Sequence, residues 1–201
     1  MFDFPRYVKE SCGGIPPEYA LLFLGANELG PISAGVDQTE FREAFSDANK
    51  AGGGSIATGK PRLDKDIRQV FGYADKLIGG LRAAGPRMKI GLLPMFPPAN
   101  QDGFGANYGC SILKYWPYRK AQHRMAELML AKYGRREAED LYIISAFAML
   151  DITHAYPTKV QPANARTAEK VVRIVNALHI NASGHAQLAD AIFAWLKCHS
   201  K

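Results

Sequence analysis

The chain has 201 residues, of which 47% are hydrophobic and 22% are charged, and its formal net charge is +6. A chain of this length and composition can bury one sizeable core, so we expect a single domain over residues 1–201. The basic residues are scattered and no apolar run reaches transmembrane length, so the sequence predicts binding neither to nucleic acid nor to a membrane.

Strands and helices alternate in the first half of the chain. A short apolar run predicts a strand over 20–24, and Asp37 with Glu40 is typical of a capping box that opens a helix over 37–49. A glycine-rich loop follows. Apolar residues at helical spacing then predict a helix over 64–84, which Gly85 and Pro86 end. This order favours a parallel sheet with crossover helices.

The second half continues the alternation. An apolar run predicts a strand over 89–95, followed by an irregular segment to about residue 117 whose aromatic residues could wall a substrate pocket. Helical spacing resumes over 118–133, and a third strand is predicted over 141–147. The last helix carries Leu188, Ile192 and Leu196 on one apolar face.

Two polar residues lie at positions where α/β proteins commonly place catalytic or ligand-binding side chains. His179 lies on a loop just before the last helix, in the position of a general base. Asn27 follows the strand over 20–24, and ligands of open α/β sheets bind outside the carboxyl ends of the strands. Each residue also has a plain interpretation, because a loop histidine can bond locally and Gly-Ala-Asn is typical of turns.

Taken together, these segments resemble the SGNH (GDSL-type) hydrolases, a family of serine esterases and lipases with a flavodoxin-like fold. The resemblance covers nearly the whole chain, from about Phe2 to Lys197, and is carried by the segments 20–29, 89–98, 106–108, 119–124 and 176–179. It implies that Asn27, with Gly25 beside it, contributes to the oxyanion hole and that His179 is the catalytic histidine. It also implies a three-layer α/β/α sheet whose N-terminal strands are missing here, so that this chain is the C-terminal portion of the domain.

Two features depart from the family pattern. No Gly-Asp-Ser occurs in the sequence, and without its serine a serine hydrolase forms no acyl-enzyme. The triad acid, commonly three residues before the histidine, is replaced by Asn176. We expect the carbonyl oxygen of Asn176 to accept the imidazole N–H and so orient His179, while Asp151 is an alternative acid.

Other candidate residues have weaker patterns. Ser55 lies in a glycine-rich stretch that fits a phosphate loop in spacing, but Pro61 replaces the required Ser or Thr, and a surface loop is favoured. Ser11 and Cys12 adjoin two glycines. The three cysteines, at 12, 110 and 198, lack the spacing of a metal site or a disulfide framework, and we expect no metal and no cofactor.

A basic, aromatic stretch over 114–124 has two interpretations. Its mixture of cations and aromatic rings is typical of a stacking platform for nucleic acid, but its spacing also fits the start of an amphipathic helix, which we favour. The N-terminus lacks the regions of a secretory signal, and since an upstream portion would carry any such signal, the sequence leaves the compartment open.

The sequence therefore predicts an SGNH-type hydrolase of carboxylic esters, with a small-molecule ester or an acylated carbohydrate as substrate, whose present chain is incomplete and inactive alone. The alternative is a non-catalytic binding module of the same fold, or one that depends on a partner. A missing first strand would leave an apolar sheet edge bare, so we also expect self-association through that edge.

Overall fold

The computed structural model describes residues 3–37, 39–43, 62–108 and 113–200, the side chains of 105–108 excepted. Its centre is a three-stranded parallel sheet in the order β1 (Tyr19–Leu24), β2 (Lys89–Pro94), β3 (Leu141–Ile143). Leu22 pairs with Leu92, and Leu92 pairs in turn with Ile143. The protein is thus an α/β protein with a parallel sheet, as the alternation of apolar runs predicts.

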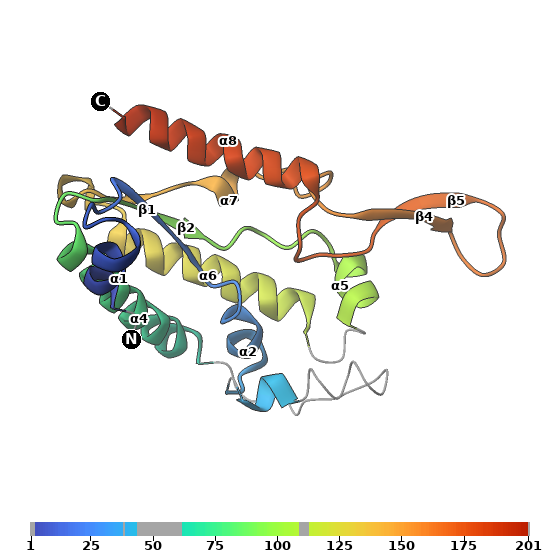
Figure 1. The fold of residues 1–201 in the computed structure, drawn as a ribbon. Coiled ribbons are helices and arrows are strands. Elements are labelled where there is room, and N and C mark those ends of the chain that lie inside the picture. Colours follow the sequence, from blue (N-terminus) through green and yellow to red (C-terminus); the bar gives the residue numbers. More distant parts are fainter. Residues whose placement is uncertain (1–2, 38, 44–61, 109–112, 201) are drawn as a thin grey trace.

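Helices cover both faces of this sheet (Figure 1). The two crossover helices, α4 (Leu63–Ala84) and α6 (Tyr115–Tyr133), lie on one face, and α8 (Ala182–His199) lies on the other. A two-stranded antiparallel ribbon of β4 (Thr158–Pro162) and β5 (Lys170–Ile174) projects from the body beside the start of α8. The remaining elements are α1 (Phe4–Ser11), α2 (Leu29–Ala34), α5 (Gln101–Tyr108), η1 (Glu137–Glu139) and α7 (Ala146–Met149).

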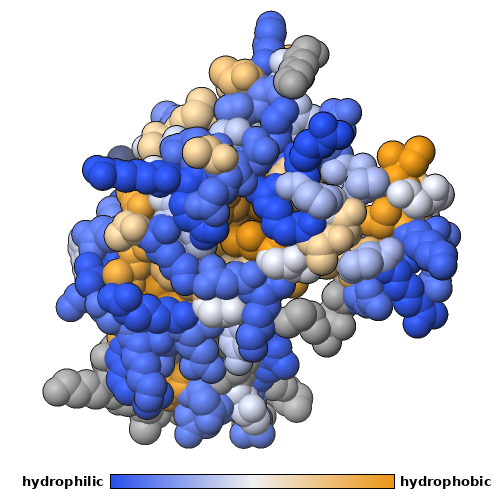
Figure 2. All heavy atoms as spheres, turned by 90° about the vertical axis from the view of Figure 1, so that its left-hand side faces the viewer, coloured by the Kyte–Doolittle hydropathy of each residue, from blue (hydrophilic) through white to orange (hydrophobic). Residues whose placement is uncertain are grey.

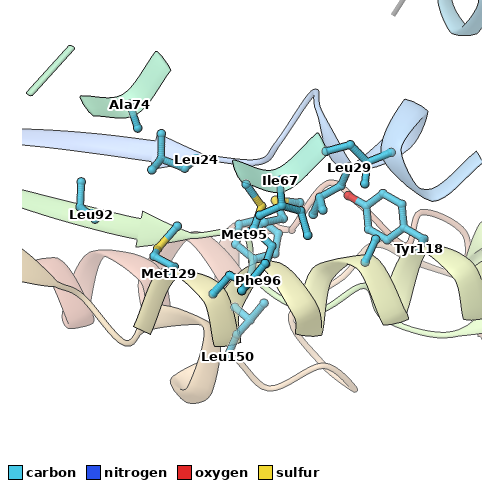
Figure 3. Packing of buried hydrophobic residues seen from close by; sticks show 14 of the residues in the cluster. Leu24, Leu29, Ile67, Ala74, Leu92, Met95, Phe96, Tyr118, Met129 and Leu150 are labelled. Atoms are coloured by element: carbon cyan, nitrogen blue, oxygen red, sulfur yellow. The ribbon is translucent and has the colours of Figure 1, made fainter. Parts of the chain in front are cut away.

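The main core lies between the sheet and the crossover helices (Figure 3). The apolar stripe of α4 contributes Ile67 and Phe71, and α6 contributes Met125 and Met129, all of them almost completely buried. The edge of the Phe71 ring packs against the ring of Tyr133 at the end of α6. Burial of these side chains stabilises the contact of both helices with β1 and β2.

On the opposite face, a glycine lets α8 approach β2 closely. A Cβ at Gly91 would lie 2.6 Å from Ile144 Cδ1 and 3.2 Å from Trp195 Cη2. The Trp195 side chain therefore occupies the space that a side chain at 91 would need. Tyr19 and Tyr142, from the two outer strands, pack edge-on against Trp195, so a second, smaller cluster holds α8 on the sheet.

Several predicted elements agree with the structure. The strands over 20–24 and 89–95 and the helix over 64–84 are confirmed by β1, β2 and α4. Residues 39–43 are helical, and the capping box is present, because Asp37 Oδ1 accepts the N–H of Glu40 while Glu40 Oε2 accepts the N–H of Asp37. The rest of that helix, the glycine-rich loop with Ser55, and Cys110 lie outside the described residues.

Other predicted elements are wrong. The strand expected over 141–147 ends at Ile143, and the apolar residues that follow form the short helix α7, since a short apolar run does not distinguish a strand from a buried helical turn. The segment before 117 is not irregular throughout, because it contains α5, and α6 begins at Tyr115 rather than at 118. The ribbon and α1 were not predicted.

Strand β1 forms one edge of the sheet in the described part of the chain. The residue before β1, Glu18, directs its backbone toward β2, since its carbonyl accepts the N–H of Lys89. Backbone groups alternate along a strand, so those of Tyr19, Leu21 and Phe23 point to the free edge. The side chains of Leu21 and Phe23 are also 42% and 45% exposed, and β1 therefore presents both polar backbone and apolar surface.

The surface at the amino ends of the strands is mixed. Figure 2, which views the molecule from the left-hand side of Figure 1, shows hydrophobic patches separated by hydrophilic residues. No helix of the described residues combines the length and the apolar character needed to cross a bilayer.

Candidate functional site

The candidate site lies at the carboxyl edge of the sheet. Because the three strands are parallel, the segments that follow Leu24, Pro94 and Ile143 emerge at the same edge. The loop before α8 is joined to this edge, since the N–H of Ala99 donates to the carbonyl of Ala177 at 3.1 Å. The structure therefore places both Asn27 and His179 on loops at the carboxyl edge.

Gly25 and Asn27 form the turn after β1. Gly25 has a φ of 100°, which favours glycine, and a Cβ there would lie 2.6 Å from Met125 Sδ. Asn27 is exposed, and its side chain makes no hydrogen bond to another described residue. Its amide is therefore free to donate within the described part, and no hydrogen bond there connects it to His179.

The side chain of Asn176 closes an Asx-turn that includes His179. Asn176 Oδ1 accepts the N–H of Leu178 at 3.0 Å and of His179 at 2.8 Å, while Asn176 Nδ2 lies 3.0 Å from His179 Nδ1. The two backbone donors fix the amide orientation, because a reversed amide would direct its NH2 group at them. Nδ1 of His179 is thus an acceptor, and the proton of the neutral ring is on Nε2.

This arrangement corrects one expectation. The carbonyl oxygen of Asn176 does not accept the imidazole N–H, because the two backbone N–H groups already occupy it. Asn176 still orients the exposed ring, but by donating to it. A neutral His179 held in this way donates a hydrogen bond at Nε2, where a general base would have to accept a proton.

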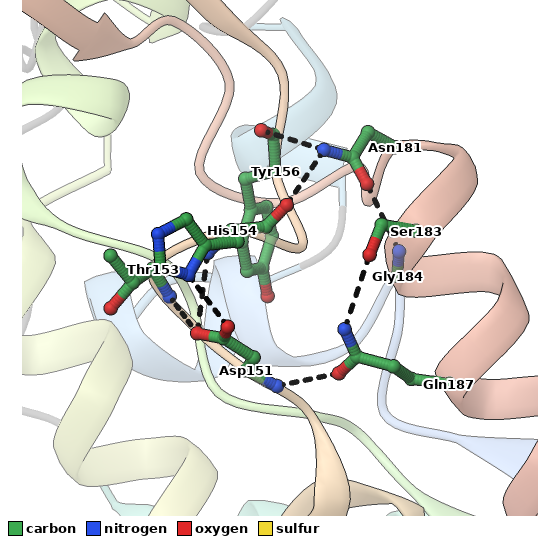
Figure 4. Close-up of polar contacts among 8 residues, drawn as sticks. All are labelled: Asp151, Thr153, His154, Tyr156, Asn181, Ser183, Gly184 and Gln187. Atoms are coloured by element: carbon green, nitrogen blue, oxygen red, sulfur yellow. Dashed lines mark hydrogen bonds and ion pairs between the residues drawn. The ribbon is translucent and has the colours of Figure 1, made fainter.

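Asp151 and His154 form a second turn of the same kind (Figure 4). Asp151 Oδ1 accepts the N–H of Thr153 at 2.8 Å and of His154 at 3.2 Å, and Asp151 Oδ2 lies 2.7 Å from His154 Nδ1. An ionised carboxylate only accepts, so Nδ1 carries the proton and Nε2 of the neutral ring is an acceptor. The hydrogen bond from His154, helped by the Thr153 N–H, holds the pKa of Asp151 below its usual value.

The structure therefore pairs Asp151 with His154, and no hydrogen bond joins Asp151 to His179 in the described part of the chain. The pair remains accessible, with 77% of the His154 side chain and 45% of the Asp151 side chain exposed. The sequence contained the signal for this pair, since Asp151 and His154 have the same three-residue spacing as Asn176 and His179. His154 itself was not among the predicted site residues.

Asn181 joins the two histidine loops. As the N-cap of α8, its Oδ1 accepts the N–H of Gly184 at 3.0 Å, and its Nδ2 donates to the carbonyls of His154 and Tyr156 at 2.9 and 3.0 Å. Its own N–H donates to the carbonyl of Ala155 at 2.9 Å. The loop 154–156 is thus bound to the segment 179–181.

Two further contacts hold this cluster. Gln187 on α8 accepts the N–H of Asp151 through Oε1 at 2.7 Å, and its Nε2 donates to Ser183 Oγ at 3.3 Å. The fully buried Tyr156 donates its hydroxyl to the carbonyl of Pro97, beyond the end of β2. Burial raises the pKa of Tyr156, so this hydroxyl stays protonated and remains a donor.

The other candidate residues lie elsewhere. Ser11 and Cys12 precede β1 and lie at the amino end of the sheet, away from this cluster (Figure 1). In the stretch 114–124, Arg124 pairs with Asp64 through two hydrogen bonds of 2.7 Å. No group of three His, Cys, Asp or Glu side chains in the described ranges could hold a metal ion.

One exposed serine follows a strand at the carboxyl edge. Ser145 lies between β3 and α7 with φ of -75° and ψ of 34°, but the sequence around it lacks the Gly-x-Ser-x-Gly pattern of a hydrolase nucleophile elbow. No hydrogen bond between Ser145 Oγ and another described side chain is present. The expected strand over 141–147 concealed this turn.

Comparison of the chain with family models, with curated proteins and with solved structures gives no match.

Proposed function

We propose that the protein hydrolyses carboxylic esters of small molecules or acylated carbohydrates at the carboxyl edge of its sheet. The observation that carries the proposal is the placement of Asn27 and the two histidine turns on loops at that edge. The resemblance to SGNH hydrolases supports the same chemistry. In that case the described sheet is part of a flavodoxin-like α/β/α domain.

Ester hydrolysis needs a proton acceptor and a donor for the oxyanion. Asn27 would donate through its exposed amide, assisted by the backbone around Gly25, and His179 would contact the reacting ester. A His179 general base would first require the Nδ1–H tautomer. Turning the Asn176 amide to accept that N–H would break its two backbone hydrogen bonds, so the Nε2–H form is favoured.

The test measures release of p-nitrophenol from p-nitrophenyl acetate and of acetate from a peracetylated sugar by the full chain. Removal of an oxyanion donor lowers kcat by about 10²- to 10³-fold, and we expect that loss in Asn27→Ala. Asn164→Ala, at the tip of the β4–β5 ribbon, is the matched control. Equal turnover of Asn27→Ala and the control would contradict the role of Asn27.

The exposed edge of β1 favours a second candidate, a module that works with another polypeptide. The backbone groups of Tyr19, Leu21 and Phe23, which have no strand beside them among the described residues, can pair with an added strand that would cover the apolar side chains of Leu21 and Phe23. The partner that we propose for this edge is a second copy of the chain, in line with the self-association expected from the sequence. Esterase activity that rises with protein concentration would support this mode.

A further inference from the structure

The two histidine turns have the same backbone hydrogen bonds, but the hydrogen bond to Nδ1 of the histidine runs in opposite directions. In each, an Asx side chain accepts the backbone N–H groups two and three residues later and contacts Nδ1 of the histidine. The atom that contacts Nδ1 is a carboxylate oxygen at Asp151 and an amide nitrogen at Asn176. The outer nitrogen, Nε2, is consequently an acceptor in His154 and a donor in His179.

We infer that His154, oriented by Asp151, is the proton acceptor of the ester hydrolysis and that His179 is a hydrogen-bond donor to the reacting ester. This inference rests on the proposed function. It assigns the base to a residue outside the motif that carries the family resemblance, and it lets water be the nucleophile, so that the absence of Gly-Asp-Ser does not prevent turnover.

The surroundings of the pair support this role. His154 is exposed, so an ester and a water can reach its Nε2. The carboxylate of Asp151 is held by two backbone N–H groups, and the Asp151 N–H is held by Gln187, so the acceptor that orients the ring is itself fixed. Asn181 attaches the backbone of this turn to the segment that follows His179.

The residues present account for every proton that the reaction transfers. Water attacks the acyl carbon while one of its protons moves to Nε2 of His154, and the imidazolium is stabilised by the ionised Asp151. The carbonyl oxygen becomes an oxyanion that accepts a hydrogen bond from Nε2–H of His179. The bond to the alkoxide then breaks, and His154 returns its proton to that oxygen, giving one acid and one alcohol.

The first test reads the tautomers directly. Long-range 1H–15N spectra of the 15N-labelled full chain at about pH 8.5, where free imidazoles are neutral, distinguish Nδ1–H from Nε2–H rings. His154→Gln and His179→Gln assign the signals. We expect Nδ1–H for His154 and Nε2–H for His179. A proton on Nε2 of His154 would overturn the inference, whatever the activity.

Reciprocal substitutions provide matched controls. Asp151→Asn keeps the oxygen that accepts the two backbone N–H groups, and Asn176→Asp does the same in the other turn, so both turns should be retained. We expect Asp151→Asn to convert His154 to the Nε2–H tautomer and Asn176→Asp to convert His179 to the Nδ1–H tautomer. Unchanged tautomers would show that Asp151 does not position the ring.

The second test measures hydrolysis of p-nitrophenyl acetate by the same variants. General base catalysis contributes about 10²- to 10⁴-fold, and we expect a loss of that size in His154→Gln and Asp151→Asn. His179→Gln retains a side-chain N–H donor and should lose much less. Full activity in His154→Gln, with activity lost in His179→Gln, would overturn the inference and leave the proposed ester hydrolysis intact. A wild-type chain that hydrolyses no ester would refute the proposed function and, with it, this role of His154.

Discussion

The carbonyl oxygen of Ala155 leaves no room for a side chain at Gly184: a Cβ at 184 would lie 2.6 Å from that oxygen and 2.7 Å from Ile180 Cβ. Gly184 lies in the first turn of α8 and is buried, and Asn181 caps the same turn. The close approach allows the loop that carries His154 to lie against the start of the helix. The glycine is therefore required by packing rather than by its backbone angles.

Gly184→Ala should destabilise the protein by about 1–3 kcal/mol, because overpacking forces backbone apart and Ala155 contributes a backbone atom to the clash. The measurement is the urea midpoint of unfolding. Gly79→Ala is the matched control, since a Cβ there meets nothing within 4 Å and the residue is within helix α4. That control should gain up to about 1 kcal/mol from helix propensity. Equal effects would contradict the packing argument.

Tyr156→Phe should lower the free energy of unfolding by about 1–3 kcal/mol, because the Pro97 carbonyl loses a buried donor. The exposed Tyr73→Phe, whose hydroxyl accepts only a 3.4 Å contact from Gln69, should be nearly neutral. Chemical denaturation of both variants measures the difference. A neutral Tyr156→Phe would mean that the link between this loop and the end of β2 contributes little.

Stability should fall in acid partly through Asp75. Burial disfavours the charged carboxylate, but hydrogen bonds from Lys132 and Tyr133 outweigh that effect and hold the pKa of Asp75 below its usual value. The contribution is therefore complete above the ordinary carboxyl pKa, near about 4, and is lost as the pH falls through the lower folded value. Urea midpoints between about pH 7 and pH 2.5 should show a shallower acid decline in Asp75→Asn than in wild type. Asp190→Asn, on α8, is the control, and a decline equal in all three proteins would refute the prediction.

A charge on the free edge of β1 should abolish self-association. Phe23→Lys places an ammonium group beside the exposed backbone of the edge, and edge lysines oppose strand pairing. Sedimentation velocity at several concentrations should show association in wild type and monomer in the variant. Tyr73→Lys removes another exposed aromatic residue, from α4, and should associate like wild type. A wild-type chain that stays monomeric at all concentrations would contradict self-association.

Much of the sheet was predictable because its first two strands are short apolar runs. The runs that became β1 and β2 are apolar and end in glycine or proline, and the stripe of α4 repeats at helical spacing over the whole element. The β4–β5 ribbon lacks this signal. Its paired residues Val160 and Val172 are exposed, so neither strand shows an alternation of buried and exposed apolar residues.

The loop positions of the candidate site residues were predictable from the sequence, but the donor and acceptor roles of the histidine nitrogens were not. Sequence patterns indicated Asn27, Asn176 and His179, and the structure places them on loops at one edge of the sheet. Which nitrogen of each ring carries the proton depends on backbone N–H groups that fix an amide or a carboxylate. Those hydrogen bonds arise from turn geometry, which spacing alone does not specify, and spacing likewise does not show that Asp151 contacts His154.

The β4–β5 ribbon lies between the two histidine turns in the sequence, and its base is closed by the N–H of Val175 donating to the carbonyl of Pro157 at 2.9 Å. The ladder continues from the base to the pair Pro162 and Lys170, so the two strands hold each other in register. Residues 164–168 at the tip can therefore be lengthened or replaced without changing the separation of the turns. A fluorophore or an affinity tag inserted there would report on the protein while leaving both imidazoles in place.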